Sequence, residues 1–164
     1  MRYNNRINNK HTEMYQLMMT AQNTFKQVDL FRGLEDTHLA EIQLLATQII
    51  FKSGDTIFEQ GDSADRLYIV AEGQVEVRYR TSGGEDVSVL FLGKGQVIGE
   101  MTLVDEGKRS ATIIAITEDT IVYSIPNKTL EALCAENTAI GYVIMRNIAQ
   151  DLSFKLRHRD FDIT

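Results

Sequence analysis

The strongest constraint on the fold is a series of short β-prone runs, separated by turn-forming residues, between residues 51 and 126. Glycine-containing breaks divide these runs at intervals of about ten residues, a spacing typical of β-sandwiches and β-barrels. In the run at residues 74–80, Val75, Val77 and Tyr79 alternate with charged residues, which is the period of a half-buried strand. The sequence therefore predicts a closed or nearly closed β-structure. The predicted strands are residues 56–58, 67–71, 74–80, 87–92, 110–115 and 120–126.

Two helices are predicted before the β-region. Apolar residues recur at three- and four-residue steps from about residue 10 to residue 31. This stripe fits a helix packed on its own domain, and it also fits one that docks on a partner or on a second copy. A second helix is predicted over residues 36–48, where Asp36 and Thr37 both suit the N-cap position.

Two further helices are predicted after the β-region. A short helix covers residues 127–135, and a longer one runs from about residue 138 to about residue 159, with a stripe that includes Ile144, Ile148 and Leu152. A homodimer through the apolar-striped end helices is one arrangement that this pattern permits. We divide the chain into an N-terminal arm and amphipathic helix, residues 1–27, and one domain over residues 28–164.

Charge and cysteine content narrow the class of protein. The net charge of −6 opposes general nucleic-acid binding, because neutralising phosphates requires a concentrated basic face. The single cysteine, Cys134, rules out a disulfide framework within the chain and favours a reducing cytoplasm. It lies in an apolar-periodic stretch, so we expect a buried structural thiol rather than a nucleophile. No apolar run approaches the length of a membrane span.

The sequence contains no residue pattern typical of metal-dependent or nucleophilic catalysis. His11, His38 and His158 are scattered and form no His-x-His pair, so a β-barrel enzyme of the cupin type lacks its metal ligands. The sequence also contains no Ser/His/Asp order with the motif of a strained nucleophile turn. We therefore expect no enzyme, no metal and no cofactor.

The segment at residues 97–112 carries the most specific chemistry. Gly95 and Gly99 allow sharp turns, and residues 100–104 can form one helical turn whose opening N–H groups favour an anion. The guanidinium of Arg109 matches phosphate oxygens in two contacts. Glu100 would be repelled by a phosphate unless it accepts a hydrogen bond from a sugar hydroxyl, and the two groups together indicate a nucleotide. The alternative is a structural ion pair between Arg109 and Glu100 that braces the loop.

This segment resembles the phosphate-binding cassette of the cyclic-nucleotide-binding domain family, whose pattern is Gly-Glu-Leu-Ala-Leu, a variable stretch, Pro-Arg, small residues and Ala-Thr. The chain departs from the pattern at Met101, at Thr102, which replaces a common alanine, and at Lys108, which replaces the usual proline. The matching residues are Gly99, Glu100, Leu103, Arg109, Ala111 and Thr112.

The similarity extends over nearly the whole chain from Val28 onward, through the entry helix, the first strands and the core turns, in order. It implies a mainly β fold with flanking helices, a double-stranded β-helix or jelly-roll-like β-roll. The roll would cover about residues 50–126, with N-terminal helices, a short cassette helix and C-terminal helices over about residues 127–159.

The resemblance also implies roles for single residues. In that family the arginine pairs with the cyclic phosphate and the glutamate holds the ribose 2′-hydroxyl, roles that fall on Arg109 and Glu100. Backbone N–H groups near the cassette helix would complete the anion site, Ser110 could donate to phosphate or base, and inward strand residues would form the wall of the base pocket. The expected ligand-binding residues are Gly99, Glu100, Met101, Arg109, Ser110, Ala111, Val77, Val89 and Leu92, with Asn147, Gln150 and Asp151 as candidates for a lid over the purine.

The function implied by the resemblance is a regulatory sensor of cAMP or cGMP that relays binding through its last helix to an unidentified effector protein or a second subunit. In relatives a helix-turn-helix follows that helix and reads DNA. The chain ends at Thr164, before such a motif, so we expect no direct DNA binding. The alternative is an interaction module that kept the β-roll and lost ligand use. A small enzyme is a third reading, but it would have no base other than Glu100.

Overall fold

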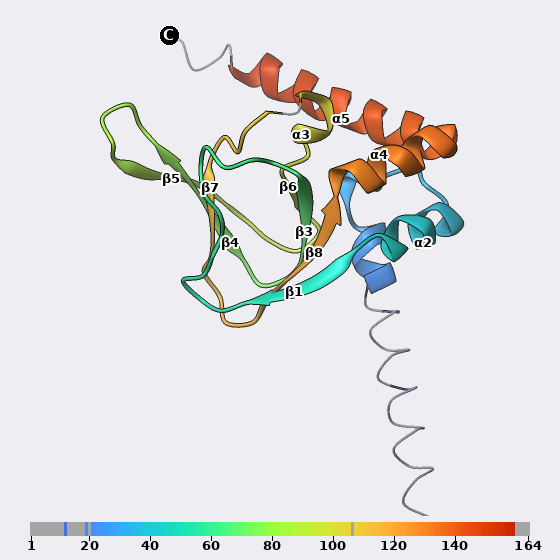
Figure 1. The fold of residues 1–164 in the computed structure, drawn as a ribbon, viewed down its shortest axis with the longest axis horizontal. Coiled ribbons are helices and arrows are strands. Elements are labelled where there is room, and N and C mark those ends of the chain that lie inside the picture. Colours follow the sequence, from blue (N-terminus) through green and yellow to red (C-terminus); the bar gives the residue numbers. More distant parts are fainter. Residues whose placement is uncertain (1–11, 13–18, 20, 106, 160–164) are drawn as a thin grey trace, which may run out of the picture.

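The computed structural model describes residues 12, 19, 21–105 and 107–159, with no side-chain description at 155, 156, 158 and 159. The strands gather on one side of the molecule, the helices lie on the other, and the last helix runs across the end of the strands (Figure 1). The strands are β1 (Thr47–Phe51), β2 (Thr56–Phe58), β3 (Arg66–Glu72), β4 (Val75–Arg80), β5 (Asp86–Leu92), β6 (Val97–Ile98), β7 (Thr112–Ala115) and β8 (Thr120–Pro126). The helices are the 3-10 helix η1 (Asp29–Phe31), α2 (Asp36–Leu44), α3 (Thr102–Asp105), α4 (Asn127–Glu136) and α5 (Thr138–Arg159).

The strands form two antiparallel four-stranded sheets, with the orders β1-β8-β3-β6 and β2-β7-β4-β5. Chain neighbours such as β2 and β3 lie in different sheets, so the chain winds back and forth between the two sheets of the roll. A small core of Val70, Val75, Ile98 and Ile113 joins residues of both sheets and fills the space between them. Burial of these β-branched side chains stabilises the roll through the hydrophobic effect.

A larger core lies between the first sheet and the helices. Strand β3 buries Leu67 and Ile69 in it, and α5 buries Ile140, Ile144 and Ile148, which recur every four residues along one helix face. This stripe fixes α5 against the roll. None of the helices in the described part of the chain carries an apolar stretch that could cross a lipid bilayer.

The predicted mainly β fold with flanking helices is confirmed. Each of the six predicted strands is present, with ends that differ by at most two residues. The last helix is present at Thr138–Arg159, and the one before it extends one residue past the prediction, to Glu136. Two strands, β1 and β6, were not predicted.

The second predicted helix, residues 36–48, is too long. Helix α2 ends at Leu44, because the N–H groups of Leu45 and Ala46 bond carbonyls three residues back and tighten the last turn. The following residues instead pair with β8 as strand β1. The apolar residues Leu45 and Ala46 continue the helical spacing, which is why the helix was predicted to extend over them. Pairing of the next residues with β8 outweighs this local preference. The predicted N-caps are also wrong, since Glu35 holds that position and makes no side-chain capping bond.

Much of the predicted N-terminal helix, at residues 10–31, lies outside the described residues. Residues 21–26 are helical, and the chain then turns into η1 rather than continuing as one helix. Phe25 is fully buried and its ring packs on those of Phe31 and Tyr123, with centroids 5.7 and 5.4 Å away. The described part of this helix therefore packs on its own domain.

Candidate functional site

A cavity of about 540 Å³ opens between the second sheet, the cassette segment and the last helix. Its walls are the β4–β5 hairpin, residues 95–102 and 108–111, and facing residues of η1 and α5. Most of the residues expected to bind a ligand line it. They are Gly99, Glu100, Met101, Arg109, Ser110, Ala111, Val77 and Leu92, together with the lid candidates Asn147 and Asp151.

Arg109 is a buried cation with unused hydrogen-bonding capacity. Its side chain lines the cavity although the residue is only 5% exposed. One guanidinium nitrogen, Nη2, donates to the carbonyl of Arg66 at 2.7 Å, whereas the buried Nε and Nη1 have no hydrogen-bond partner. Desolvation lowers the pKa of Arg109, while Tyr68 and two nearby aspartates act in the opposite direction. Unpaired buried donors cost free energy, so an anion in the cavity would stabilise this site.

Two aromatic rings hold the guanidinium in place. The Arg109 Cζ lies 4.0 Å from the ring centroid of Phe58 and 5.5 Å from that of Tyr68. A cation over a ring face is attracted by the ring quadrupole, which offsets part of the cost of burial. These rings were not predicted as site residues. Their positions in β2 and β3 gave no signal, because strand aromatics are ordinary core residues.

The backbone of Arg109 is fixed by the turn after β2. Its carbonyl accepts a hydrogen bond from Gly61 N at 2.8 Å, and its N–H donates to the carbonyl of Asp62 at 3.0 Å. An isolated bridge between Ser63 and Lys108 continues this pairing. The backbone of Arg109 is therefore held by a short pairing of residues 61–63 with residues 108–109, outside the two main sheets.

Gly99 is required by both its backbone and its neighbour. Its φ is +82°, a left-handed conformation that residues with a side chain rarely adopt. A Cβ at this position would also collide with Nη1 of Arg109. The glycine thus lets the cassette backbone and the guanidinium approach each other closely.

The alternative of a loop-bracing ion pair is not supported. Among the ion pairs formed within the described residues, none joins Arg109 to Glu100. Both residues line the same cavity. They therefore form two parts of one wall, as a ligand site requires.

The cassette helix begins later than predicted. The prediction placed it at residues 100–104, but α3 runs over Thr102–Asp105, with a turn before it in which Leu103 N bonds Glu100 O at 3.1 Å. Thr102 is buried, and its hydroxyl donates to the Gly99 carbonyl at 2.8 Å. The same hydroxyl accepts a bond of 2.8 Å from Asn127 Nδ2 at the start of α4. Asn127 was not predicted as a site residue, because an asparagine at the start of a predicted helix is ordinarily explained by its place at the helix terminus.

The prediction that Val89 forms part of the pocket wall is wrong, and Leu90 takes that place. Val89 is 57% exposed and does not line the cavity, whereas Leu90 does. The β4–β5 register shifts between Val77 and Arg78, so that Val77 pairs with Leu90 and Arg78 pairs with Ser88. Strand residues alternate between the two faces, so Leu90 shares the face of Leu92, two positions away, whereas Val89 lies on the other face. The bulge in addition leaves Val89 without a partner on β4.

The lid candidates on α5 separate into two groups. Asn147 and Asp151 are four residues apart, share a helix face and border the cavity, but Gln150 lies on a different hollow that also includes Arg146. The Asn147 Nδ2 group donates to the carbonyls of Leu30 and Arg32, each at 2.9 Å. This residue therefore ties α5 to η1 at the edge of the cavity.

Metal chemistry finds no site here. Within the part of the chain that the structure describes, no group of three or more His, Cys, Asp or Glu residues is placed to hold a metal ion.

Comparison with known proteins gives similarities to regulators. The chain is 32% identical over 134 residues to the cyclic AMP receptor protein of Thermus thermophilus, covering 82% of this chain and 60% of that protein. It is 27% identical over 131 residues to the cAMP-dependent protein kinase regulatory subunit of Dictyostelium discoideum, covering 80% of this chain and 39% of that protein. The chain therefore spans less than two thirds of the length of either relative.

A solved structure shows the same architecture. The N-terminal domain of a transcriptional regulator from Streptomyces coelicolor A3(2) superimposes with a TM-score of 0.72 at 29% identity, covering 80% of this chain and 94% of that one. Residues 48–137 match the family described as "Cyclic nucleotide-binding domain". This range includes the cassette, α4 and all eight strands, except for the first residue of β1. By this match and by its β-roll, the chain belongs to the cyclic nucleotide-binding domain family.

Proposed function

We propose that this chain binds a cyclic purine nucleotide, cAMP or cGMP, in the 540 Å³ cavity and acts as a regulatory sensor rather than an enzyme. The observation that carries the proposal is the buried guanidinium of Arg109, whose Nε and Nη1 lack partners at the cavity wall. A cyclic phosphate supplies two oxygens for such donors. The names of the Thermus and Dictyostelium relatives, which refer to cAMP, support this ligand class.

The remaining groups divide the ligand between them. Arg109 binds the phosphate, with the cassette backbone near Glu100, Met101 and Ala111 as further donors, and Glu100 accepts a hydrogen bond from the ribose 2′-hydroxyl. Ser110 donates to the phosphate or the base. The apolar side chains of Val77, Leu90 and Leu92 form the wall against the purine.

Asp151 borders the cavity with a carboxylate, and we propose that it meets the amino group of the base. The NH2 group of Asn147 is already engaged by two backbone carbonyls of the N-terminal segment, so its main role is to hold α5. A carboxylate can accept hydrogen bonds from the exocyclic amino group of adenine or of guanine. Asp151 therefore does not by itself select between the two nucleotides.

Binding is relayed through the helices that touch the site. Helix α5 borders the cavity at Asn147, Ile148 and Asp151, and α4 is bonded to the cassette through Asn127. A ligand that prefers one arrangement of these helices shifts the population toward it. The receiver is an effector protein or a second copy, which would meet the outer face of α5, where Tyr142, Met145 and Phe154 are exposed.

Calorimetric titration with cAMP and with cGMP tests the proposal. We expect saturable heat with at least one nucleotide, and a raised unfolding temperature in its presence, because a ligand that binds only the folded state stabilises it. Arg109→Lys keeps the charge but loses the planar fork of donors, so we expect at least about tenfold weaker binding. No heat and no thermal shift with either nucleotide would favour the interaction module without a ligand.

Two further measurements address the rest of the proposal. Nucleotide recovered unchanged after long incubation is the expected result for a sensor, and hydrolysis would support an enzyme instead. Sedimentation velocity with and without nucleotide distinguishes the receivers. A dimer that forms or separates on binding indicates a second copy, and a constant monomer indicates an effector protein.

A further inference from the structure

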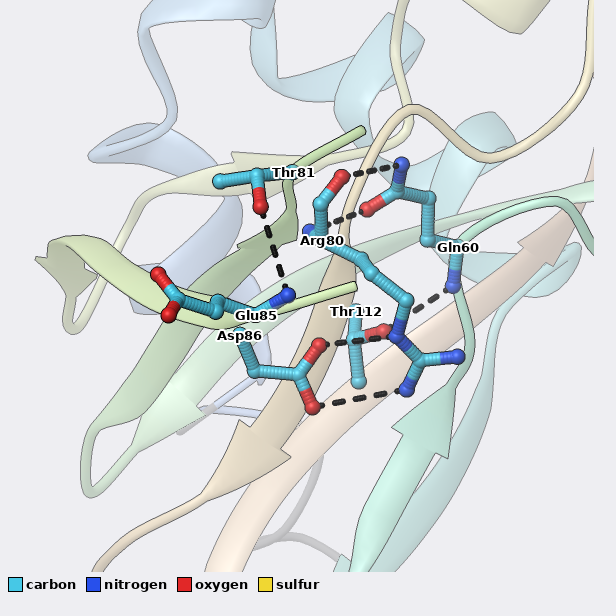
Figure 2. A network of polar contacts seen from close by, with 6 residues as sticks. All are labelled: Gln60, Arg80, Thr81, Glu85, Asp86 and Thr112. Carbon is cyan, nitrogen blue, oxygen red and sulfur yellow. Dashed lines mark hydrogen bonds and ion pairs between the residues drawn. The ribbon is translucent and has the colours of Figure 1, made fainter. Parts of the chain in front are cut away.

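The side-chain amide of Gln60 makes the hydrogen bonds to the end of β4 that a neighbouring strand would otherwise make. Its Oε1 accepts a hydrogen bond from Arg80 N at 2.7 Å, and its Nε2 donates to Arg80 O at 3.4 Å. Figure 2 shows this amide lying beside the main chain of Arg80, with both its polar atoms turned toward that residue. One residue of β4 is therefore paired on this side by a side chain rather than by a neighbouring strand.

The sheet needs this substitute because β7 leaves β4 early. The β4–β7 pairing ends at Arg78 and Thr112, and beyond it β4 continues for two more residues, to Arg80. On the β7 side the chain departs into residues 108–111, which line the cavity and carry Arg109. Gln60 also donates its own N–H to Thr112 Oγ1 at 3.0 Å, so it stands at the point where the two strands separate.

The same turn holds the backbone of Arg109. Gly61 and Asp62, the two residues after Gln60, exchange backbone hydrogen bonds of 2.8 and 3.0 Å with Arg109. Residues 60–62 thus bind both the distal end of the β4–β5 hairpin, at Arg80, and the loop that carries Arg109. In the proposed complex the loop faces the phosphate, and the same hairpin faces the base farther along, at Val77, Leu90 and Leu92.

The attachment reaches β5 through Arg80. Strand β5 is at the edge of its sheet, and all its residues except Leu92 are exposed. Its far end is joined to β4 by the two contacts of the Arg80 guanidinium with Asp86, at 2.9 and 3.4 Å (Figure 2). Fixing Arg80 therefore fixes the distal end of the whole hairpin.

We infer that Gln60 is a positioning residue that sets the apolar hairpin wall against Arg109, so that base and phosphate can be held together. This inference rests on the proposed nucleotide site and deepens it. Gln60 itself does not line the cavity. It acts through Arg80 on the wall side and through the adjoining Gly61–Asp62 backbone on the phosphate side.

Three variants isolate the amide. Gln60→Met keeps the length and removes both side-chain hydrogen bonds. Gln60→Glu keeps the acceptor for Arg80 N, the shorter of the two bonds, and serves as the conservative variant. Gln48→Met makes the same replacement on strand β1, in the other sheet, and is the control.

The first readout is amide hydrogen exchange by NMR in the ligand-free protein. We expect the Arg80 N–H to exchange faster in Gln60→Met, by about fivefold for the loss of one hydrogen bond, and to stay near the wild-type rate in Gln60→Glu and Gln48→Met. An unchanged Arg80 rate in Gln60→Met contradicts the inference. If Gln60→Met does not fold, Gln60→Ala and Gln60→Glu are compared in the same way.

The second readout is a double-mutant cycle with Leu90→Ala, measured as nucleotide affinity. We expect Gln60→Met to weaken binding about fivefold and to reduce the further effect of Leu90→Ala, because a displaced wall makes poorer contact. Additive effects, or wild-type affinity in Gln60→Met, would overturn the inference while the proposed function stands. If the wild type binds neither nucleotide, the proposed function is wrong and this inference falls with it.

Discussion

Thr102 and Asn127 join the cassette helix α3 to helix α4 through one buried hydrogen bond of 2.8 Å. The Thr102 hydroxyl also donates to Gly99 O, so a single side chain connects the arginine-facing glycine, the cassette and the first C-terminal helix. Family members with alanine at the Thr102 position lack this hydroxyl. In this chain the cassette and α4 are therefore coupled by a specific contact as well as by packing.

Replacing Thr102 by valine tests that contact. The change keeps the shape and removes the hydroxyl, leaving Asn127 with one partner fewer in a site where its Oδ1 already has none. We expect a loss of about 1–2 kcal/mol in the free energy of unfolding, measured by urea denaturation. Thr102→Ser, which retains the hydroxyl, is the control. A larger loss for serine than for valine would assign the effect to packing of the threonine methyl group instead.

Gly99→Ala should abolish tight nucleotide binding. The alanine Cβ meets Nη1 of Arg109 and is also strained by the positive φ. Gly54→Ala is a matched control, since Gly54 has a φ of +93° and nothing within 4 Å of an added Cβ. Strain alone costs each variant about 1–2 kcal/mol of stability. Binding should fall only for Gly99→Ala, and calorimetry that shows equal affinity for the two variants would contradict the assigned contact.

Leu90→Ala and Val89→Ala form a second matched pair. Leu90 lines the cavity and Val89 does not, although they are neighbours on β5. We expect Leu90→Ala to weaken nucleotide binding about threefold to tenfold, through lost apolar contact, and Val89→Ala to leave it unchanged. The affinities are measured by titration calorimetry. A larger loss of affinity for Val89→Ala than for Leu90→Ala would contradict this assignment and support the predicted wall, which contained Val89.

This pair also shows what the sequence could and could not predict. The prediction grouped Val89 with Leu92, although two residues three positions apart lie on opposite faces of a strand, and Leu90 is the residue that shares the face of Leu92. The sequence also did not reveal the β4–β5 register, which sets Leu90 opposite Val77. Register depends on the partner strand, and a single sequence does not contain it in readable form. By contrast, Gly99, Glu100 and Arg109 were found from local spacing, because glycine geometry and charge leave a signal that does not depend on distant pairing.

Long-range contacts account for the other differences. The first two residues of β1 were interpreted as the end of a helix because Leu45 and Ala46 continue the helical spacing, whereas the β8 partners of β1 lie 69 to 77 residues away in sequence. Asn127 and Gln60 act through hydrogen bonds to residues 25 and 20 positions away. Such roles become visible only when the fold brings the partners together.

Cys134 should react slowly with alkylating reagents. Burial raises the pKa of its thiol, with a smaller contribution from Glu131 in the same direction. A raised pKa means a smaller thiolate fraction at a given pH, so the rate of reaction with iodoacetamide should be below that of a free thiol and should rise at higher pH. The rate is measured by mass spectrometry between pH 7 and pH 10, about the range over which an ordinary thiol ionises. A rate equal to that of glutathione at each pH would contradict this environment.

The most direct test of the nucleotide site is the Arg109 side-chain Nε–H signal, followed by ¹H–¹⁵N NMR as cAMP or cGMP is added. The account predicts that this signal shifts with ligand concentration and saturates together with the calorimetric binding curve, because a phosphate oxygen accepts a hydrogen bond from a donor that has no partner within the protein. Nucleotide binding that leaves the Nε–H signal in place would contradict it.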